Sequence, residues 1–214
     1  MDPDEAVQRL GSDTVRMYLA FVGPYNEVST YPWNPDGVVG VRRFLERVWK
    51  TTDRIAAKPT QTLEPILHKT IKKVGEDITA LKFNTAISAL MIFLNAVDKE
   101  GSIGKEQYKT LLCLIAPFAP HMAEELWGKL GHHKTLAYEP WPIYDPACLV
   151  EDQVEMAVLI GGKVRAKITV SNGMNPSEIE KFVLADSKVT AWTEGKTIVK
   201  VIVVPGRTVN IVIK

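Results

Sequence analysis

Hydrophobic positions in the first 131 residues recur with the three-to-four-residue spacing of amphipathic helices. The clearest stripe follows Asp36, an N-cap type of residue, with apolar side chains on one face and basic ones largely outside it. Residues 84–97 are apolar on most sides, which predicts a helix at the centre of the packing. The other predicted helices start near Ser12, Leu63 and Tyr108, and a short helical piece follows the last of them and ends before Gly131. The pattern therefore predicts an antiparallel bundle of about five helices.

The pattern changes after Gly131. Residues 132–152 contain three prolines and predict an extended connector, because proline removes a backbone donor and biases its predecessor away from helix. β-branched runs then predict strands at residues 154–160, 164–170, 198–204 and 208–213. Gly161-Gly162 and Pro205-Gly206 predict hairpin turns, and Asn175 opens a predicted helix between the two hairpins. The sequence thus predicts an α+β protein with a helix bundle at 1–131, a connector at 132–152 and a small ββαββ domain at 153–214.

Charge and apolarity alternate with a period of two along residues 163–168. Alternate side chains of a strand point to the same face, so Lys163, Arg165 and Lys167 are predicted to share one face. Their spacing of about 6.6 Å suits contacts to the phosphates of a nucleic acid. The alternative is an edge strand whose lysines prevent pairing with another sheet.

The formal net charge of the 214 residues is only +1, but the charges are unevenly distributed. From Gly161 to the end there are nine basic and four acidic residues, a net charge of +5. The preceding residues carry 17 basic and 21 acidic side chains, a net charge of −4. This asymmetry favours a polyanionic partner for the C-terminal segment. A non-catalytic protein-interaction module with a basic rim stays open as the alternative.

The sequence contains no constellation of catalytic or metal-binding residues. Cys113 and Cys148 lack a CxxC spacing, and the pair His132-His133 lacks a third ligand at a regular spacing, so no metal site is predicted. Glu124 and Glu125 are neighbours on a predicted helix, where successive side chains point about 100° apart. This geometry disfavours paired acid–base catalysis.

The composition is typical of a globular protein, with 46% hydrophobic and 24% charged residues. The most apolar window, residues 86–96, is too short to cross a bilayer, and the first residues lack the pattern of a signal peptide. We therefore expect a cytoplasmic protein that does not bind membranes.

Several blocks of sequence resemble the C-terminal portion of the bacterial-type leucyl-tRNA synthetases, a family of class I aminoacyl-tRNA synthetases. Blocks similar to the family's helical anticodon-binding domain are residues 12–18 (SDTVRMY), 37–49 (GVVGVRRFLERVW) and 116–127 (APFAPHMAEELW). The third block is shared with sister synthetases. Blocks more specific for the leucine enzyme are residues 139–142 (EPWP), 162–165 (GKVR), 195–197 (GKT) and 201–206 (VIVVPG). Together the blocks span almost the whole chain.

The resemblance implies that this chain corresponds to one part of a larger enzyme. Class I synthetases carry a His-Ile-Gly-His-like signature and a Lys-Met-Ser-Lys-Ser-like loop, and neither occurs here, while residues 1–5 resemble the stretch after that loop. The resemblance therefore implies a fragment without the catalytic and editing domains, inactive alone, from a parent that ligates leucine to tRNA(Leu) with ATP and magnesium. For this chain we expect no cofactor, no metal site and no catalytic residue. We expect a monomer whose partners are tRNA(Leu) and the catalytic core.

The candidate RNA-binding residues are cations on rigid elements. The first set is Lys163, Arg165 and Lys167 on the predicted strand, and the second is Arg42, Arg43 and Arg47 on the long predicted helix. Arg165 is the strongest candidate for a specific contact, because a guanidinium group can donate two parallel hydrogen bonds. The alternative for the helix arginines is pairing with acids such as Glu46. The resemblance implies that the helical domain lies along the tRNA and that the small domain reaches its outer corner.

Overall fold

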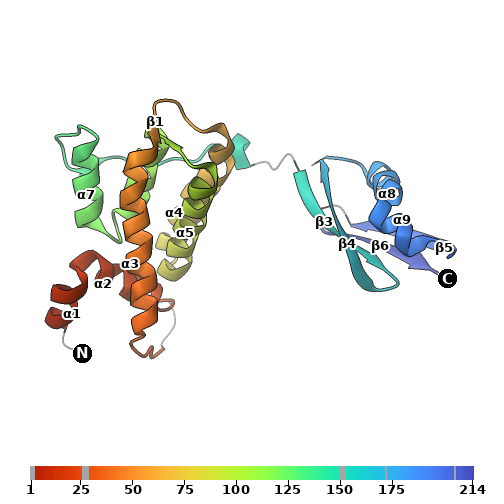
Figure 1. The fold of residues 1–214 in the computed structure, drawn as a ribbon, viewed down its shortest axis with the longest axis horizontal. Coiled ribbons are helices and arrows are strands. Elements are labelled where there is room, and N and C mark those ends of the chain that lie inside the picture. The colour runs from red at the N-terminus through yellow and green to blue at the C-terminus, as the bar shows by residue number, and fades with distance from the viewer. Residues whose placement is uncertain (1–2, 26–28, 150–152, 172, 205) are drawn as a thin grey trace. The chain divides into compact units, whose positions relative to one another are not determined.

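The structure is a computed structural model that describes residues 3–25, 29–149, 153–171, 173–204 and 206–214 (Figure 1). By its contacts the chain divides into two compact units, Met1–Leu149 and Val150–Lys214. Each unit has a hydrophobic core of its own. The first core is built from helices, and the second from a sheet with two helices.

The first unit is a bundle of helices. Its helices are α1 (Pro3–Leu10), α2 (Ser12–Phe21), α3 (Pro35–Lys50), α4 (Glu64–Thr79), α5 (Phe83–Glu100), α6 (Lys105–Ile115) and α7 (Pro120–Lys129). The predicted central helix is α5, where Ile87, Leu90, Phe93 and Leu94 are fully buried. The predicted helical bundle is thus confirmed. Within the described residues, none of the helices is both long enough and apolar enough to cross a membrane.

The helix α3 begins before its predicted cap. The side-chain Oδ1 of Asn34 accepts hydrogen bonds from the backbone N–H groups of Asp36 at 3.0 Å and Gly37 at 3.4 Å. Pro35 occupies the first turn of α3, where a missing backbone donor is tolerated. The prediction that Asp36 caps the helix is therefore wrong, because Pro35 already supplies the helical backbone angle one residue earlier.

Two elements of the first unit have no counterpart in the hydrophobic pattern. One is α1 at Pro3–Leu10, which precedes the first predicted helix. The other is a pair of two-residue parallel strands, β1 (Ile55–Ala56) and β2 (Ile103–Gly104). A Cβ atom on Gly104 would lie 2.5 Å from the Cα of Pro59, so the close approach of the backbone after β1 to Gly104 requires glycine. Strands of this length carry too little sequence pattern to be predicted.

The predicted connector packs on the first unit as far as residue 149. Two 3₁₀ turns, η3 (Leu136–Tyr138) and η4 (Pro146–Leu149), interrupt it. Leu136 is buried in the helical core, and the backbone N–H of Asp145 donates a 3.0 Å hydrogen bond to Nδ1 of His68 on α4. These contacts anchor residues 132–149, and residues 150–152 lie outside the described part of the chain.

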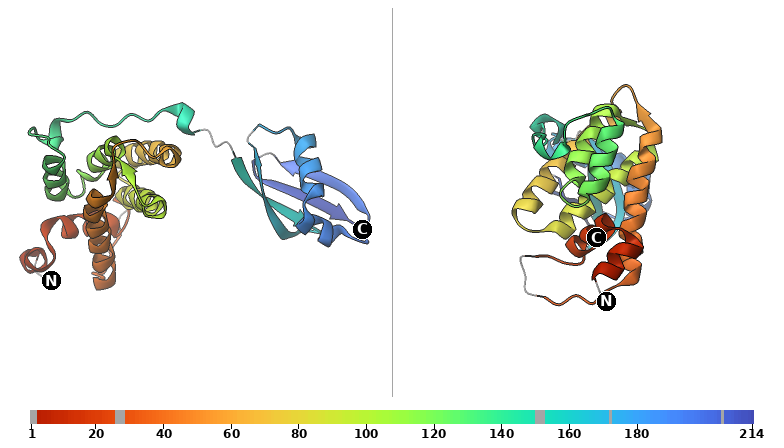
Figure 2. Two further views of the ribbon diagram at one scale, coloured as in Figure 1. Left: turned by 45° about the horizontal axis from the view of Figure 1, so that its top comes forward. Right: turned by 90° about the vertical axis from the view of Figure 1, so that its left-hand side faces the viewer.

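The second unit is a four-stranded sheet with helices on one face, as Figure 2 shows. Its elements are β3 (Gln153–Ile160), β4 (Lys163–Ser171), α8 (Pro176–Ala185), α9 (Ser187–Thr193), β5 (Ile198–Val204) and β6 (Thr208–Ile213). The strand order is β4-β3-β6-β5, with two antiparallel hairpins joined by the parallel pair β3 and β6. The α+β fold class is confirmed, and α9 is an additional helix. Of the second predicted turn, Pro205 lies outside the described residues.

Helices α8 and α9 cover the core side of the sheet. The buried side chains of β3 at positions 156, 158 and 160 pack with Ile179 and Val183 of α8 and with Val189 of α9. We call the opposite side, where neighbouring positions such as Ala157 point, the helix-free face, since side chains of a strand alternate between faces.

Candidate nucleic-acid interface

The strand β4 carries three of the predicted RNA contacts and begins after a tight turn. Gly161 and Gly162 have φ angles of 56° and 79°, and two successive left-handed residues are what a type I′ hairpin turn needs. From there β4 runs antiparallel to β3 at the edge of the sheet. Ala166, Ile168 and Val170 are buried in the core of the second unit. The predicted hairpin is confirmed, and it fixes the start of β4.

A β-bulge interrupts this hairpin at Arg165. Val158 pairs with Ala166, and the next residue of β3, Leu159, pairs with Val164. Arg165 is therefore an extra residue without a cross-strand partner. An inserted residue shifts the alternation of side chains by one position.

The bulge divides the three predicted cations between the two faces of the sheet. Lys163 pairs with a core residue of β3, and cross-strand partners share a face, so Lys163 lies on the side of the helices. Arg165 reaches the same side, since its guanidinium carbon lies 4.0 Å from the ring centroid of Trp192 on α9. Lys167 pairs with Ala157 on the helix-free face. The prediction that all three cations share one face is wrong, because the bulge breaks the period of two.

Lys167 has an acidic partner on its own face. Its Nζ atom lies 2.6 Å from Oε1 of Glu155 on β3, and both side chains are largely exposed. The hydrogen bond with Glu155 and the negative charge of this carboxylate raise the pKa of Lys167 above its ordinary value. Lys167 thus stays charged, but a carboxylate already compensates this charge, which weakens its attraction for a phosphate.

Arg165 and Lys163 have no ion pair within the described residues. Arg165 lies against Trp192 in a cation–π contact, and both side chains are exposed. The side chain of Arg165 donates no hydrogen bond to another described residue, so its N–H groups keep their capacity to donate. Lys163 is exposed at the start of β4. These two residues form the free cationic part of the strand.

The arginines of α3 have different surroundings. Helix α3 buries one stripe of apolar residues, and Arg42 and Arg43 lie exposed on its other side. Nε of Arg42 lies 3.1 Å from Oε1 of Glu46, one turn further along the helix. Arg43 has no ion pair among the residues that the structure describes. The interpretation of pairing with Glu46 therefore holds for Arg42 and leaves Arg43 free.

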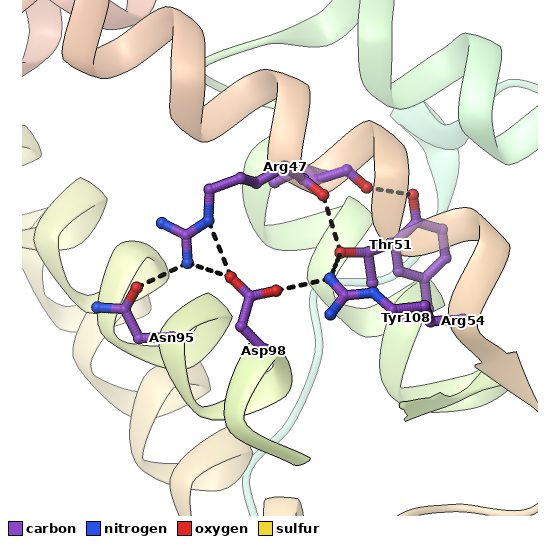
Figure 3. Close-up of polar contacts among 7 residues, drawn as sticks. Arg47, Thr51, Arg54, Asn95, Asp98 and Tyr108 are labelled. Carbon is purple, nitrogen blue, oxygen red and sulfur yellow. Dashed lines mark hydrogen bonds and ion pairs between the residues drawn. The ribbon is translucent and has the colours of Figure 1, made fainter. Parts of the chain in front are cut away.

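Arg47 is held by α5, as Figure 3 shows. Its Nε and Nη2 atoms donate to Oδ2 of Asp98 at 2.9 and 2.5 Å, and Nη2 also donates to Oδ1 of Asn95 at 2.7 Å. The other carboxylate oxygen of Asp98 accepts a 2.6 Å hydrogen bond from Nη2 of Arg54. One carboxylate thus binds two guanidinium groups, and it links α3, α5 and the 3₁₀ turn η1 (Thr51–Arg54).

The network extends to the backbone of α3. Oγ1 of Thr51 donates to the carbonyl oxygen of Arg47 at 2.9 Å and accepts from Arg54 at 3.0 Å (Figure 3). The hydroxyl of Tyr108 on α6 donates to the carbonyl oxygen of Val48 at 3.0 Å, and burial raises the pKa of this tyrosine. These contacts stabilise the C-terminal end of α3. Together with Asp98 they hold Arg47 in a structural network that its position in the sequence does not reveal.

The charges of this network act on Asp98. Partial burial raises its pKa, but hydrogen bonds from Arg54 and Arg47, together with their positive charges, outweigh that effect and lower the pKa below the ordinary value. Asp98 is therefore ionised at neutral pH, and it compensates the charge of Arg47. A phosphate would compete with this carboxylate for Arg47.

A protein-family model agrees with this architecture. The model described as the anticodon-binding domain of tRNA ligase matches residues 61–181, which is more than half of the 214 residues. The chain belongs to this family. Its anticodon-binding domain includes α4 to α7, and the matched region continues into β3, β4 and α8.

A solved structure is similar to this member of the family over all of its residues. A leucyl-tRNA synthetase from Agrobacterium radiobacter, solved in a ternary complex with tRNA and LeuAMS, is similar over 100% of the chain, with a TM-score of 0.81 and 29% sequence identity. The chain spans 30% of the length of that synthetase. The resemblance to leucyl-tRNA synthetases is thus confirmed over both units.

Polar clusters elsewhere in the first unit stabilise its helices. Oδ2 of Asp13 on α2 accepts a 2.7 Å hydrogen bond from the backbone N–H of Met122, and its Oδ1 lies 2.7 Å from Nδ1 of His121. Glu124 accepts hydrogen bonds from the hydroxyl of Thr135 and from the backbone N–H of Leu136, and these contacts lower its pKa. These acids connect chain segments, and no group of three or more metal-ligand residues occurs in the described part of the chain.

Sequence reasoning missed the partners that decide which cations are free. Asp98 is 51 positions from Arg47, and Glu155 is 12 positions from Lys167. It also missed Trp192, because the short helix α9 has no predicted counterpart. The sequence does contain a signal for the start of α9. Asp186 is an N-cap type of residue, and its Oδ1 accepts a hydrogen bond from the backbone N–H of Lys188 at 2.8 Å.

Proposed function

We propose that this chain is the tRNA-binding portion of a leucine–tRNA ligase. In this proposal it positions tRNA(Leu) for ATP-dependent leucylation on a catalytic domain, which would use ATP and magnesium and would be its partner. The similarity to a leucyl-tRNA synthetase over all residues of the chain, at 29% identity, carries the proposal. Membership in the anticodon-binding family supports binding of tRNA by the helical unit.

The exposed cations supply the physical basis for RNA binding. Duplex RNA is recognised mainly through its phosphates, 2′-hydroxyl groups and shape, so a protein needs cations whose charge is not already compensated. Arg43 on α3 meets this condition in the first unit, and Lys163 and Arg165 meet it in the second. Arg47 and Lys167 are weaker candidates, because Asp98 and Glu155 bind them.

The proposal is tested by binding labelled tRNA(Leu) to the chain over a series of salt concentrations. Three phosphate contacts give a slope of log affinity against log salt of about −2 to −3. Measurable binding with such a slope supports the proposal. Absence of binding at low salt, or an affinity that does not depend on salt, contradicts it and favours the protein-interaction alternative.

A second measurement addresses the leucine-specific part of the proposal. In a ligase that contains this chain together with a catalytic domain, Arg165→Ala should raise the KM for tRNA(Leu) with little change in kcat, because the residue contributes to binding and not to the chemical step. For the chain alone, Arg165→Ala should weaken tRNA(Leu) more than other tRNAs. An equal loss for all tRNAs would reduce Arg165 to a phosphate contact without specificity.

A further inference from the structure

Among the described residues, Trp192 is the only aromatic residue in a cation–π contact with one of the predicted RNA-binding cations. Its indole ring lies 4.0 Å from the guanidinium carbon of Arg165, and 42% of the tryptophan remains exposed. Here the indole lies beside a strand bulge whose extra residue is an arginine.

Two lysines flank this stacked pair. Lys188 precedes Trp192 by four positions on α9, so both side chains lie on the same side of the helix. Nζ of Lys196 donates a 3.1 Å hydrogen bond to the carbonyl oxygen of Trp192, which places this lysine beside the C-terminal end of α9. Both lysines are exposed. We call the surface made by Lys163, Arg165, Lys188, Trp192 and Lys196 the α9–β4 edge.

Charge distinguishes this edge from the helix-free face of the same sheet. Within the described residues, no acidic side chain forms an ion pair with the four cations of the α9–β4 edge. On the helix-free face, Lys167 is paired with Glu155, and the neighbouring exposed side chains include Val164, Ile202 and Val204. A polyanion therefore meets more uncompensated charge at the α9–β4 edge.

We propose that the α9–β4 edge is the surface through which the second unit contacts tRNA, with its lysines on phosphates and with Trp192 as the positioning residue of Arg165. This inference rests on the proposed tRNA-binding function and names the surface that serves it. An arginine side chain has many rotamers, and stacking on the indole restricts them before RNA binds. The guanidinium group of Arg165 can donate two parallel hydrogen bonds to a phosphate or to a base edge.

The test measures the affinity of the whole chain for tRNA(Leu) in variants of the edge. Trp192→Leu should weaken binding about two- to fivefold, the range of an exposed cation–π contact. Trp192→Phe keeps an aromatic ring and should retain most of the affinity. Lys188→Ala should make the salt slope shallower by about 1. The matched control is Lys200→Ala, which removes an exposed lysine from the helix-free face and should leave the slope unchanged.

Coupling between the two stacked residues separates positioning from a general structural effect. If Trp192 acts through Arg165, then Trp192→Leu has no further effect on affinity once Arg165→Ala is present. Equal losses in both backgrounds overturn the positioning role. A slope that changes with Lys200→Ala and not with Lys188→Ala overturns the choice of surface.

The same series distinguishes this inference from the proposed function. If the unmodified chain does not bind tRNA(Leu) at low salt, the proposed function itself fails. If the unmodified chain binds and all edge variants bind equally well, only the α9–β4 edge is excluded. Should Trp192→Leu unfold, as circular dichroism would show, Lys188→Ala against Lys200→Ala still decides the surface.

Discussion

Asp98 is the side chain on which the contacts between α3, η1 and α5 converge. Its two carboxylate oxygens accept from Arg47 and Arg54 at 2.5 and 2.6 Å, and its side chain is 35% exposed. Solvent access screens such pairs, so their contribution to the free energy of unfolding lies between that of a surface ion pair and that of a buried one. The arrangement makes Asp98 a stabilising residue of the first unit.

Replacement of Asp98 by asparagine should lower the free energy of unfolding by about 1–2 kcal/mol, because its three charge-assisted hydrogen bonds are weakened or lost while the shape is kept. Urea denaturation at neutral pH measures the loss. Glu106→Gln is the control, since Glu106 pairs with Lys109 through a side chain that is 77% exposed. A loss for Glu106→Gln as large as that for Asp98→Asn would show that the Asp98 network stabilises the fold no more than an exposed ion pair does.

The effect of Asp98 should also depend on pH. The folded protein lowers the pKa of Asp98 below its ordinary value of 3.8. A lowered pKa contributes stability that is fully present above the ordinary value and is lost as the pH falls through the folded value. The difference in unfolding free energy between the native chain and Asp98→Asn should therefore shrink on acidification below pH 3.8. A difference that grows on acidification would contradict the sign.

At the scale of elements, the start of α8 shows a complete capping box. Oδ1 of Asn175 accepts from the backbone N–H of Glu178 at 2.9 Å, and Oε2 of Glu178 accepts from the backbone N–H of Asn175 at 3.0 Å. Pro176 follows the cap in the first turn. All three signals lie within four residues, so the sequence alone predicted this helix start.

Asn175→Ala should destabilise the second unit by about 1 kcal/mol, because one backbone donor of α8 loses its acceptor. Amide hydrogen exchange of α8 measures the effect, with faster exchange expected for the variant. Asn175→Asp keeps a side-chain acceptor and should exchange at nearly the native rate. Similar acceleration in both variants would exclude the cap as the cause.

The strand β4 shows why an element can be predicted while its faces are not. The turn Gly161-Gly162 and the β-branched run predicted the strand from local signals. The bulge at Arg165 depends on the register with β3, which is a property of two strands. A single extra residue therefore moved Lys167 to the face opposite Arg165, although their sequence spacing is that of neighbours on one face.

At the scale of the whole molecule, the chain has two separate hydrophobic cores. Leu112 is fully buried in the helical core, and Ile211 is fully buried under the helices of the second unit. No residue belongs to both cores among the described residues. Domains with their own cores can unfold as separate units.

Cavity mutations should therefore act on one unit each. Leu112→Ala and Ile211→Ala each remove a fully buried aliphatic side chain, and each should cost about 2–5 kcal/mol in its own unit. Hydrogen exchange with mass spectrometry should show faster exchange in the first unit for Leu112→Ala and in the second unit for Ile211→Ala. Acceleration across both units from either variant would show that they unfold together.

The sequence by itself determined most of the elements and their order. Amphipathic stripes, a glycine pair and a capping box are local signals, so the bundle, the β4 hairpin and α8 follow from residues that are close along the chain. Charge asymmetry and sequence blocks also indicated a tRNA-binding protein before any coordinates. Each of these features lies within the sequence itself, so it can be recognised without knowledge of the fold.

Only the tertiary structure decided which cations are free to bind a polyanion. Arg47 and Lys167 are compensated by acids from other elements, while Arg165 stacks on Trp192 of a helix 27 positions further along the chain. Ion pairs and ring contacts depend on distances of a few ångströms between segments far apart in sequence, and local pattern does not fix such distances. The sequence therefore named the candidate cations, and the fold selected among them.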